Sequence, residues 1–174
     1  MILRKNLYNV VIVLPMIHIR IAKKEDLFDL AIVYQNAYNN IPELKEKWTD
    51  ESALDLVKYF YNIQADLFFV AESEGRVVGG IASVVKPWWD GNHLTDAEIF
   101  VMPNFQKQGI GTRLMKQMLI AALNKYNVVL WEAYTHTFYQ HPLDWYKRLG
   151  CEEMSHFVMI SGNIKKMLKN IDKL

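Results

Sequence analysis

The chain has 174 residues, 51% of them hydrophobic and 22% charged, with a formal net charge of +1 at pH 7. This length and composition predict one globular domain with a substantial core. The near-neutral charge gives no bulk attraction to nucleic acid or to an anionic membrane surface, so neither is expected as a partner. The single cysteine, Cys151, excludes an intramolecular disulfide and a cysteine-cluster metal site, which fits a reducing, cytoplasmic location.

The first fifteen residues differ in character from the rest. They carry two early positive charges and an apolar run from Leu7 to Leu14, as signal peptides do, but Asn9 interrupts the run and no small-x-small cleavage site follows. Met16 opens a segment that would itself be a natural start. Residues 1–15 are therefore interpreted as an extra strand or an artefact of start-codon choice, and residues 16–174 as one domain.

Strand and helix patterns begin at residue 17. Isoleucine at every second position of residues 17–21 predicts a strand. Residues 24–39 place apolar and small side chains on one helical face, so a helix is expected there. A second helix is expected over about 49–64, with Thr49 as its N-cap and two acidic residues in its first turn.

A hairpin is expected after these helices. Residues 67–72 and 76–85 have the composition of two strands, and a Glu-Gly turn lies between them. Gly79 and Gly80 fall inside the second strand, where glycine indicates a bulge or a close backbone neighbour.

The next segment is predicted to be a loop followed by a strand. Residues 86–93, with the sequence KPWWDGNH, have loop composition, and residues 95–101 have that of a strand. Strand alternation would place Asp96 and Glu98 on the same face. An amphipathic helix over residues 109–126 comes next.

The C-terminal third completes a mixed α/β pattern. Residues 128–134 predict a short buried strand, and residues 142–149 predict a short helix that Gly150 ends. Residues 155–160 are expected to form a last strand, before a basic C-terminal helix. Early hairpins and a late strand–helix–strand crossover indicate one α/β domain.

The glycines in VMPNFQKQGIGTRLM, residues 101–115, suggest close approach of a phosphate to the backbone. A P-loop is excluded, because Thr and Arg follow Gly111 where Lys and Ser/Thr are required. A dinucleotide fingerprint is a second interpretation, since Gly109 and Gly111 give G-x-G and Glu132 lies at the position of a ribose-binding carboxylate. Against it, Leu114 occupies the third glycine position.

A third pattern, Q/R-x-x-G-x-G/A, is filled by Gln106, Gly109 and Gly111. Together with V-x-P upstream, the VVGG of the preceding hairpin, and YKRLGC near the C-terminus, it resembles the GNAT superfamily of acetyl-CoA-dependent N-acyltransferases. The resemblance covers the chain from Met16 to about Ile160. It implies a central, mostly antiparallel sheet that is splayed between the fourth and fifth family strands and flanked by helices.

The resemblance implies that acetyl-CoA is the cosubstrate and that no metal is needed. Amides before the helix N-terminus would hold the coenzyme A pyrophosphate, because they have no intrahelical acceptor and lie at the positive end of the helix dipole. Lys107 and Arg113 would add local positive charge. The residues expected to bind the coenzyme are Phe100, Val101, Gln106, Lys107, Gln108, Gly109, Ile110, Gly111 and Thr112.

Three side chains are the catalytic candidates that the resemblance implies. Glu98, on the fourth family strand, is the first candidate for the base that accepts the amine's proton, and Glu132 on the next strand is its rival. Tyr146 matches the family tyrosine that protonates the leaving thiolate. A main-chain N–H near Val101 or Met102 would stabilise charge on the thioester oxygen.

The chain departs from the family pattern near its C-terminus. Tyr139 and Pro142 stand where family members often have an asparagine and a small residue, which puts one coenzyme contact in doubt. Cys151 is interpreted as a buried small hydrophobe, with a covalent acyl-cysteine route as the alternative. The chain is also short after Cys151, so the family's last strand is either trimmed or supplied elsewhere.

Aromatic and acidic residues gather where the family binds its acceptor. They suggest a site for an ammonium group, while packing and loop anchoring are the favoured interpretation of any single aromatic. His93, His136 and His141 lack a defensible metal-ligand spacing and are interpreted as polar loop residues. The residues expected to bind the acceptor are Trp88, Trp89, Asp90 and Tyr134.

The sequence thus predicts a cytoplasmic N-acetyltransferase. It would move an acetyl group from acetyl-CoA to a primary amine of a small molecule, such as an amine, a polyamine or an aminoglycoside-like compound, by direct attack through a tetrahedral intermediate. A peptide or protein amine is an alternative acceptor, and a coenzyme A-binding module without turnover is an alternative of another class. The oligomeric state, including a homodimer, is left open.

Overall fold

The computed structural model describes residues 3–5, 11–13, 16–138 and 140–172. The chain forms two compact units, Met1–Tyr134 and Thr135–Leu174. The interpretation of residues 16–174 as one domain stays a prediction. No helix among the described residues has the length and apolarity that crossing a membrane requires.

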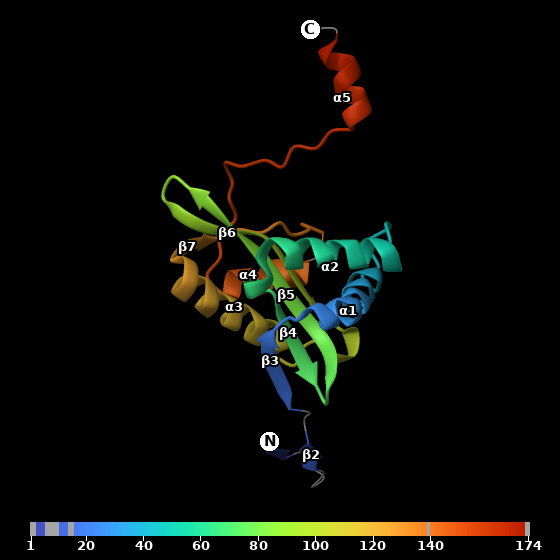
Figure 1. Ribbon diagram of the computed structural model, residues 1–174, viewed down its shortest axis with the longest axis vertical. Helices are drawn as coiled ribbons and strands as arrows, with labels where there is room; N and C mark the ends of the chain where they lie inside the picture. Colours follow the sequence, from blue (N-terminus) through green and yellow to red (C-terminus); the bar gives the residue numbers. More distant parts are fainter. Residues whose placement is uncertain (1–2, 6–10, 14–15, 139, 173–174) are drawn as a thin grey trace. The chain divides into compact units, whose positions relative to one another are not determined.

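A five-stranded mixed sheet forms the centre of the first unit (Figure 1). The strand order is β3-β4-β5-β6-β7. Neighbouring strands from β3 to β6 are antiparallel, and β7 is parallel to β6. The α/β fold with a mostly antiparallel sheet is therefore confirmed. The strands are β3 (Ile17–Ile21), β4 (Phe69–Ser73), β5 (Arg76–Trp88), β6 (Gly91–Val101) and β7 (Val128–Trp131).

A separate two-stranded antiparallel sheet pairs β1 (Leu3–Lys5) with β2 (Val11–Val13). The rest of the extension, residues 1–2, 6–10 and 14–15, lies outside the described residues.

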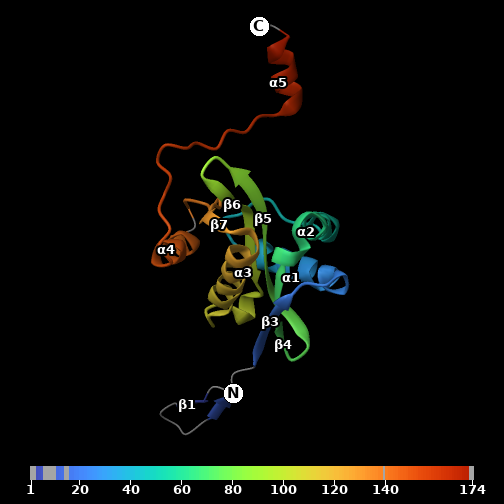
Figure 2. The ribbon, with the colours of Figure 1, turned by 60° about the vertical axis from the view of Figure 1, so that its left-hand side comes forward.

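Helices cover both faces of the five-stranded sheet: Figure 2 shows α1 and α2 on one side and α3 on the other. They are α1 (Leu27–Asn39), preceded by η1 (Lys24–Asp26), α2 (Asp50–Gln64), followed by η2 (Ala65–Leu67), and α3 (Ile110–Tyr126), preceded by η3 (Pro103–Phe105). Thr49 is the N-cap of α2, as predicted, and accepts from the amide of Ser52 at 3.1 Å.

Gly79 and Gly80 in β5 lie where both helical layers approach the sheet. A Cβ on Gly80 would come within 2.6 Å of Phe100 and 2.8 Å of Leu30 in α1. A Cβ on Gly79 would meet the carbonyl of Phe100 at 3.0 Å and Leu114 of α3 at 3.5 Å. The expected close backbone neighbour is confirmed, and it keeps α1 and α3 tight against opposite faces of the sheet.

The hairpin of β5 and β6 is longer than predicted. Residues 86–93 were expected to form a loop, but Lys86 pairs with His93 and Trp88 with Gly91, so only Trp89 and Asp90 form the turn. The loop prediction was wrong because Trp-Asp-Gly has turn composition, while its neighbours on either side continue the ladder.

A β-bulge in β6 sets which side chains share a face. Ala82 pairs with Glu98 and Val84 pairs with Thr95, so two residues of β6 stand opposite Ser83 alone. Asp96, in this bulge, is exposed and has a φ of 51°. The alternation expected for Asp96 and Glu98 is therefore interrupted.

The bulge also determines which side chains of β6 face α1. Since Ala82 and Val84 share a face of β5, their partners Glu98 and Thr95 share that face too, together with His93. The hydroxyl of Ser83 donates to the Thr95 carbonyl at 2.8 Å and holds the bulge in place.

β6 and β7 diverge after a short pairing. Their ladder ends at Leu94 and Trp131, with one further bond from the Glu132 amide to the Leu94 carbonyl at 2.8 Å. Residues 95–101 of β6 have no described strand on that side. The predicted splay between these two strands is confirmed.

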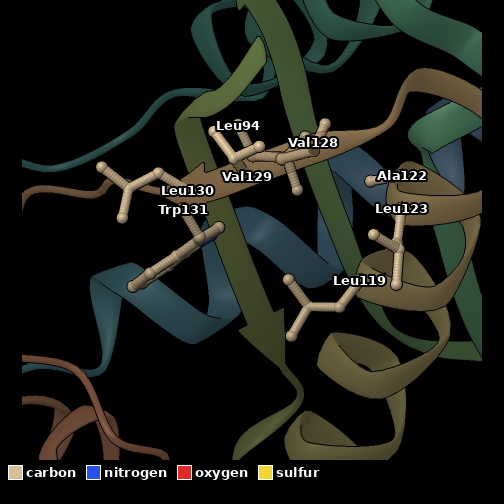
Figure 3. A pocket seen from close by; sticks show the side chains of 8 residues that line it. All are labelled: Leu94, Leu119, Ala122, Leu123, Val128, Val129, Leu130 and Trp131. Atoms are coloured by element: carbon tan, nitrogen blue, oxygen red, sulfur yellow. The ribbon is translucent and has the colours of Figure 1, made fainter. Parts of the chain in front are cut away.

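An open apolar groove of about 210 Å³ lies between α3 and β7 (Figure 3). It faces the side of the sheet opposite Glu98, because Leu94 lines it and lies on the α3 face. Its lining is Leu94, Leu119, Ala122, Leu123, Val128, Val129, Leu130 and Trp131. With no charged side chain, this groove is not suited to hold a phosphate or an ammonium.

The second unit contains α4 (Gln140–Arg148) and α5 (Ile164–Ile171). Gly150 follows α4 with a φ of 93°, which agrees with the predicted helix end. The strand predicted over residues 155–160 is wrong: this segment is irregular, with Val158 80% and Ile160 88% exposed. Its apolar side chains have strand composition, but no described strand pairs with it.

Gly80→Ala should lower the free energy of unfolding by about 1–3 kcal/mol, because the new methyl group clashes with Phe100 and Leu30 on a packed face. Urea unfolding followed by circular dichroism measures the change. The matched control is Gly111→Ala, whose Cβ would have only Ile99 at 3.7 Å. Equal stability of the two variants would contradict the close packing at Gly80.

Candidate active site

Glu98 lies on β6 against the first helix. Its Oε2 accepts hydrogen bonds from the hydroxyls of Tyr38 at 2.6 Å and Tyr34 at 3.3 Å, both from α1. Burial raises the pKa of Glu98, the two tyrosine hydrogen bonds oppose this rise, and the charge of Asp96 adds to it. A half-buried carboxylate with a raised pKa and one oxygen not engaged by the tyrosines is suited to accept a proton.

The connection between α1 and α2 closes over this tyrosine pair. Trp48 packs edge-on against Tyr34, with 5.0 Å between ring centroids. The carbonyl of Trp48 accepts from Gln35 at 3.1 Å and from Asn39 at 2.9 Å. Sequence reasoning missed Tyr38 and Trp48 as site residues; the only available signal was the spacing of four between the tyrosines, which places them on one helical face.

The amide of Val101 points into the gap between β6 and β7. Met102 donates to the Val78 carbonyl at 2.9 Å, and successive amides along a strand alternate in direction. The Val101 N–H therefore faces away from β5, toward the side that β7 has left. Of the two donors predicted, Met102 is engaged with Val78, and Val101 is the one whose direction suits an oxyanion.

The loop before α3 has the geometry of an anion site. Lys107 and Gly109 have φ of 59° and 81°, and the N-cap of α3 is Gly109 itself, with no side-chain cap. The first hydrogen bond of the helix runs from the Arg113 amide to the Gly109 carbonyl at 3.1 Å. The amides of Ile110 and Gly111 therefore have no acceptor within the helix. Since α3 also has no acidic residue in its first turn, its positive end suits a phosphate.

The space around the two glycines fits such a ligand. A Cβ on Gly109 would have no neighbour within 4 Å, and a Cβ on Gly111 would have only Ile99 at 3.7 Å. Packing of the chain therefore does not require glycine at position 111, although glycine there costs helix stability. The backbone at this position is therefore open to close approach by a ligand.

Three polar side chains in this region donate hydrogen bonds to backbone carbonyls of the chain. Gln106 donates to the Val101 carbonyl at 3.0 Å, and Gln108 donates to the Asn104 carbonyl at 3.1 Å. Arg113, expected to add charge at the phosphate, instead donates to the Ile17 carbonyl at 2.6 Å.

Three further residues of the predicted coenzyme set differ in exposure. Phe100 and Ile110 are buried in the core, so only their backbone groups are available to a ligand. Thr112 lies exposed in the first turn of α3.

Glu132 lies beside a buried histidine. Oε1 of Glu132 is 3.3 Å from Nδ1 of His93, and Asp90 Oδ1 is 2.9 Å from its Nε2. His93 is 2% exposed, so its interpretation as a polar loop residue was wrong. His93 lies in the part of β6 that extends the hairpin, and the sequence did not predict this extension.

Two of the predicted acceptor residues, Trp88 and Asp90, lie beside this histidine. Trp88 ends β5 and is 6.0 Å from His93 and 5.0 Å from Trp89, measured between ring centroids. Trp89 at the turn is 82% exposed, and Tyr134, beyond β7, is also exposed. Trp88 and Asp90 are thus brought together with Glu132, and Trp89 extends the hairpin into solvent.

The second unit holds Tyr146 and Cys151. Tyr146 lies in α4 with its ring 4.9 Å from that of Trp145, and its role as the acid stays a prediction. Burial raises the pKa of the half-buried Cys151 thiol, which disfavours the thiolate that an acyl-cysteine route requires. Tyr139 lies outside the described residues, and Pro142 lies within α4.

Tyr38→Phe should raise the pKa of Glu98 further, because it removes a hydrogen bond that favours the carboxylate form. The titration of Glu98 can be followed by carbon NMR of labelled glutamate side chains. Tyr34→Phe is the matched control and should move the titration less, since its bond is longer. No shift in Tyr38→Phe would contradict the hydrogen bond.

Sequence comparison identifies the family to which the chain belongs. The sequence model of the acetyltransferase (GNAT) family matches residues 34–151. An uncharacterized N-acetyltransferase of Methanocaldococcus jannaschii is 31% identical over 142 residues, or 78% of this chain and 60% of the relative. A second, of Archaeoglobus fulgidus, is 32% identical over 114 residues, or 62% of this chain and 74% of the relative.

Solved structures agree on the fold. The aminoglycoside N-acetyltransferase AAC(6')-Iy, solved in complex with CoA, matches with a TM-score of 0.65 and 19% identity, covering 88% of this chain and 99% of that one. The present chain spans 60% of the length of the Methanocaldococcus relative. The family model matches more than half of the chain, so the chain belongs to the acetyltransferase (GNAT) family.

Proposed function

We propose that this chain transfers an acetyl group from acetyl-CoA to a primary amine of a small molecule, with Glu98 as the general base. The observation that carries the proposal is the position of Glu98. It lies on the part of β6 that pairs with β5 but not with β7, three residues before Val101, whose amide faces the gap that β7 leaves, and its pKa is raised by burial. A proton acceptor and a hydrogen-bond donor for the oxyanion thus lie within one short segment of β6.

The loop before α3 is proposed to hold the coenzyme. Its backbone amides at Ile110 and Gly111 and the space over Gly109 fit a pyrophosphate. When bound, acetyl-CoA supplies the thioester carbonyl that an amine attacks. Gln106, by fixing the Val101 carbonyl, joins this loop to the end of β6.

Residues of the first unit are proposed to accept the amine's proton and to stabilise the oxyanion. A free alkyl amine, with a pKa of about 10, is protonated at neutral pH, and Glu98 accepts its proton directly or through water. Tyr38 and Tyr34 hold one carboxylate oxygen, which leaves Oε1 to face the amine. The Val101 N–H donates to the oxygen on which charge develops. The acid for the departing thiolate, Tyr146 of the second unit, stays a prediction from the sequence.

A small amine is the proposed acceptor. Trp88 offers a ring face for cation–π contact, and Asp90 and Glu132 supply negative charge beside it. The structural neighbour AAC(6')-Iy is an aminoglycoside N-acetyltransferase, which is compatible with a polycationic small molecule. The single cysteine of the chain favours the cytoplasm as the proposed location.

Glu98→Gln should lower kcat by about 10²–10⁴ without weakening coenzyme A binding, because it removes the base but not the coenzyme site. In the native protein kcat/KM should rise with pH through a pKa above the usual range of glutamate, since the base works only when deprotonated. Thiol release from acetyl-CoA over a library of amines and peptides measures both. Release with peptides alone would contradict the small-molecule acceptor, and unchanged kcat in Glu98→Gln would contradict the base.

Gly111→Val should weaken coenzyme A binding at least about tenfold, or ~1.4 kcal/mol, while the protein stays folded. Its Cβ would meet only Ile99 at an ordinary distance, so the side chain projects into the space proposed for the pyrophosphate. Calorimetric titration with coenzyme A measures the affinity, and the melting temperature of the free protein reports the fold. Gly111→Ala is the smaller control and should have a smaller effect. Native affinity in Gly111→Val would contradict the site.

A further inference from the structure

His93 lies between two carboxylates on the α1 side of the sheet. Its Nε2 is 2.9 Å from Asp90 and its Nδ1 is 3.3 Å from Glu132, which come from the β5–β6 turn and the end of β7. The side chain of His93 is only 3% exposed, whereas those of Asp90 and Glu132 are 49% and 32% exposed. A buried imidazole thus joins two carboxylates that remain open to solvent.

The contact with Glu132 is close without being a hydrogen bond. His93 Nδ1 is buried and has no hydrogen-bond partner, although the Glu132 oxygen lies at ion-pair distance. If Nε2–H donates to Asp90 in the neutral ring, Nδ1 and Glu132 are two acceptors facing each other without a donor. If the ring carries both protons, the three side chains together still bear a charge of −1. In both states the cluster is negative, with a charge of −2 when the ring is neutral and −1 when it is protonated.

The β-bulge places this cluster on the same face of the sheet as Glu98. Glu98 pairs with Ala82, and Leu94, whose carbonyl binds the Glu132 amide, pairs with Val85. Ala82 and Val85 are three residues apart on β5, or about 10 Å at the rise of a strand. The cluster and the proposed base therefore lie along one face, about that far apart.

An aromatic ring beside the cluster already accepts an ammonium. The Lys86 amine lies 4.6 Å from the centroid of the Trp88 ring, and Trp88 is 6.0 Å from His93. Lys86 is exposed and pairs with His93 across the hairpin. Its charge partly offsets the cluster, and it shows that the ring face is accessible to a cationic nitrogen.

We propose that Glu132 and Asp90, positioned by His93, form a binding site for a second ammonium group of the acceptor. The acceptor class is then a diamine or polyamine that is long enough to reach from Glu98 to the cluster, which lies about 10 Å further along the sheet. This inference rests on the proposed function, and it makes Glu132 a binding residue rather than the base. Glu132 and Asp90 bind the cation, and His93 acts through them.

The test uses linear diamines of increasing length, each paired with the monoamine of the same length, and acetyl-CoA as donor. The native protein should prefer the longer diamines over their monoamines in kcat/KM. In Glu132→Gln this preference should fall about tenfold, or ~1.4 kcal/mol, through KM rather than kcat. Glu25→Gln, which removes an exposed carboxylate from η1, is the matched control and should keep the preference.

His93 is tested by two substitutions that keep part of its geometry. His93→Gln retains a donor toward Asp90, and His93→Leu retains only bulk. The diamine preference should fall more in His93→Leu than in His93→Gln, with the melting temperature of each recorded. A purely structural role would lower kcat/KM for diamines and monoamines alike.

The outcomes separate this inference from the function on which it rests. If no amine is acetylated, the proposed function fails and the inference with it. If monoamines and diamines are acetylated equally well by the native protein, or if Glu132→Gln lowers kcat for both alike, the function stands and the ammonium site is overturned.

Discussion

The separation of β6 from β7 after Leu94 is the constraint on which the site depends. A strand inside a sheet normally has its amides bonded on both sides, and buried amides without partners are costly. Here the part of β6 beyond Leu94 is paired with β5 alone, so the Val101 amide faces a gap. A ligand that accepts from this amide recovers the missing bond, which is why a strand that ends its pairing early can serve as a binding surface.

The β-bulge adds a second constraint, since it decides which residues share the face of Glu98. Without the extra residue opposite Ser83, Thr95 and His93 would point to the α3 side, toward the apolar groove. With it, Glu98, Thr95 and His93 share the α1 side, and Leu94 turns to the α3 side. One inserted residue therefore decides which polar side chains of β6 join Glu98.

Local features of the site were predictable from the sequence, and features made by packing were not. The phosphate-type loop was predicted from the two glycines before an amphipathic helix, and Glu98 was predicted from the family resemblance, which implies a base on this strand. Tyr38 and Trp48 could not be found, because only the fold brings α1 and its loop over β6. The hairpin end and residues 155–160 were misjudged, because composition does not report whether a neighbouring strand is present to pair.

The two glutamates beside the gap differ in environment, and that difference is the basis of the roles proposed for them. Glu98 is held by two hydroxyl groups, and burial raises its pKa toward the range of a useful base. Glu132 is more open, lies beside an imidazole and shares its surroundings with Asp90. A carboxylate that exchanges protons needs burial, and one that binds a cation needs access and neighbouring negative charge. The same residue type is thus proposed for catalysis at one end of the face and for recognition at the other.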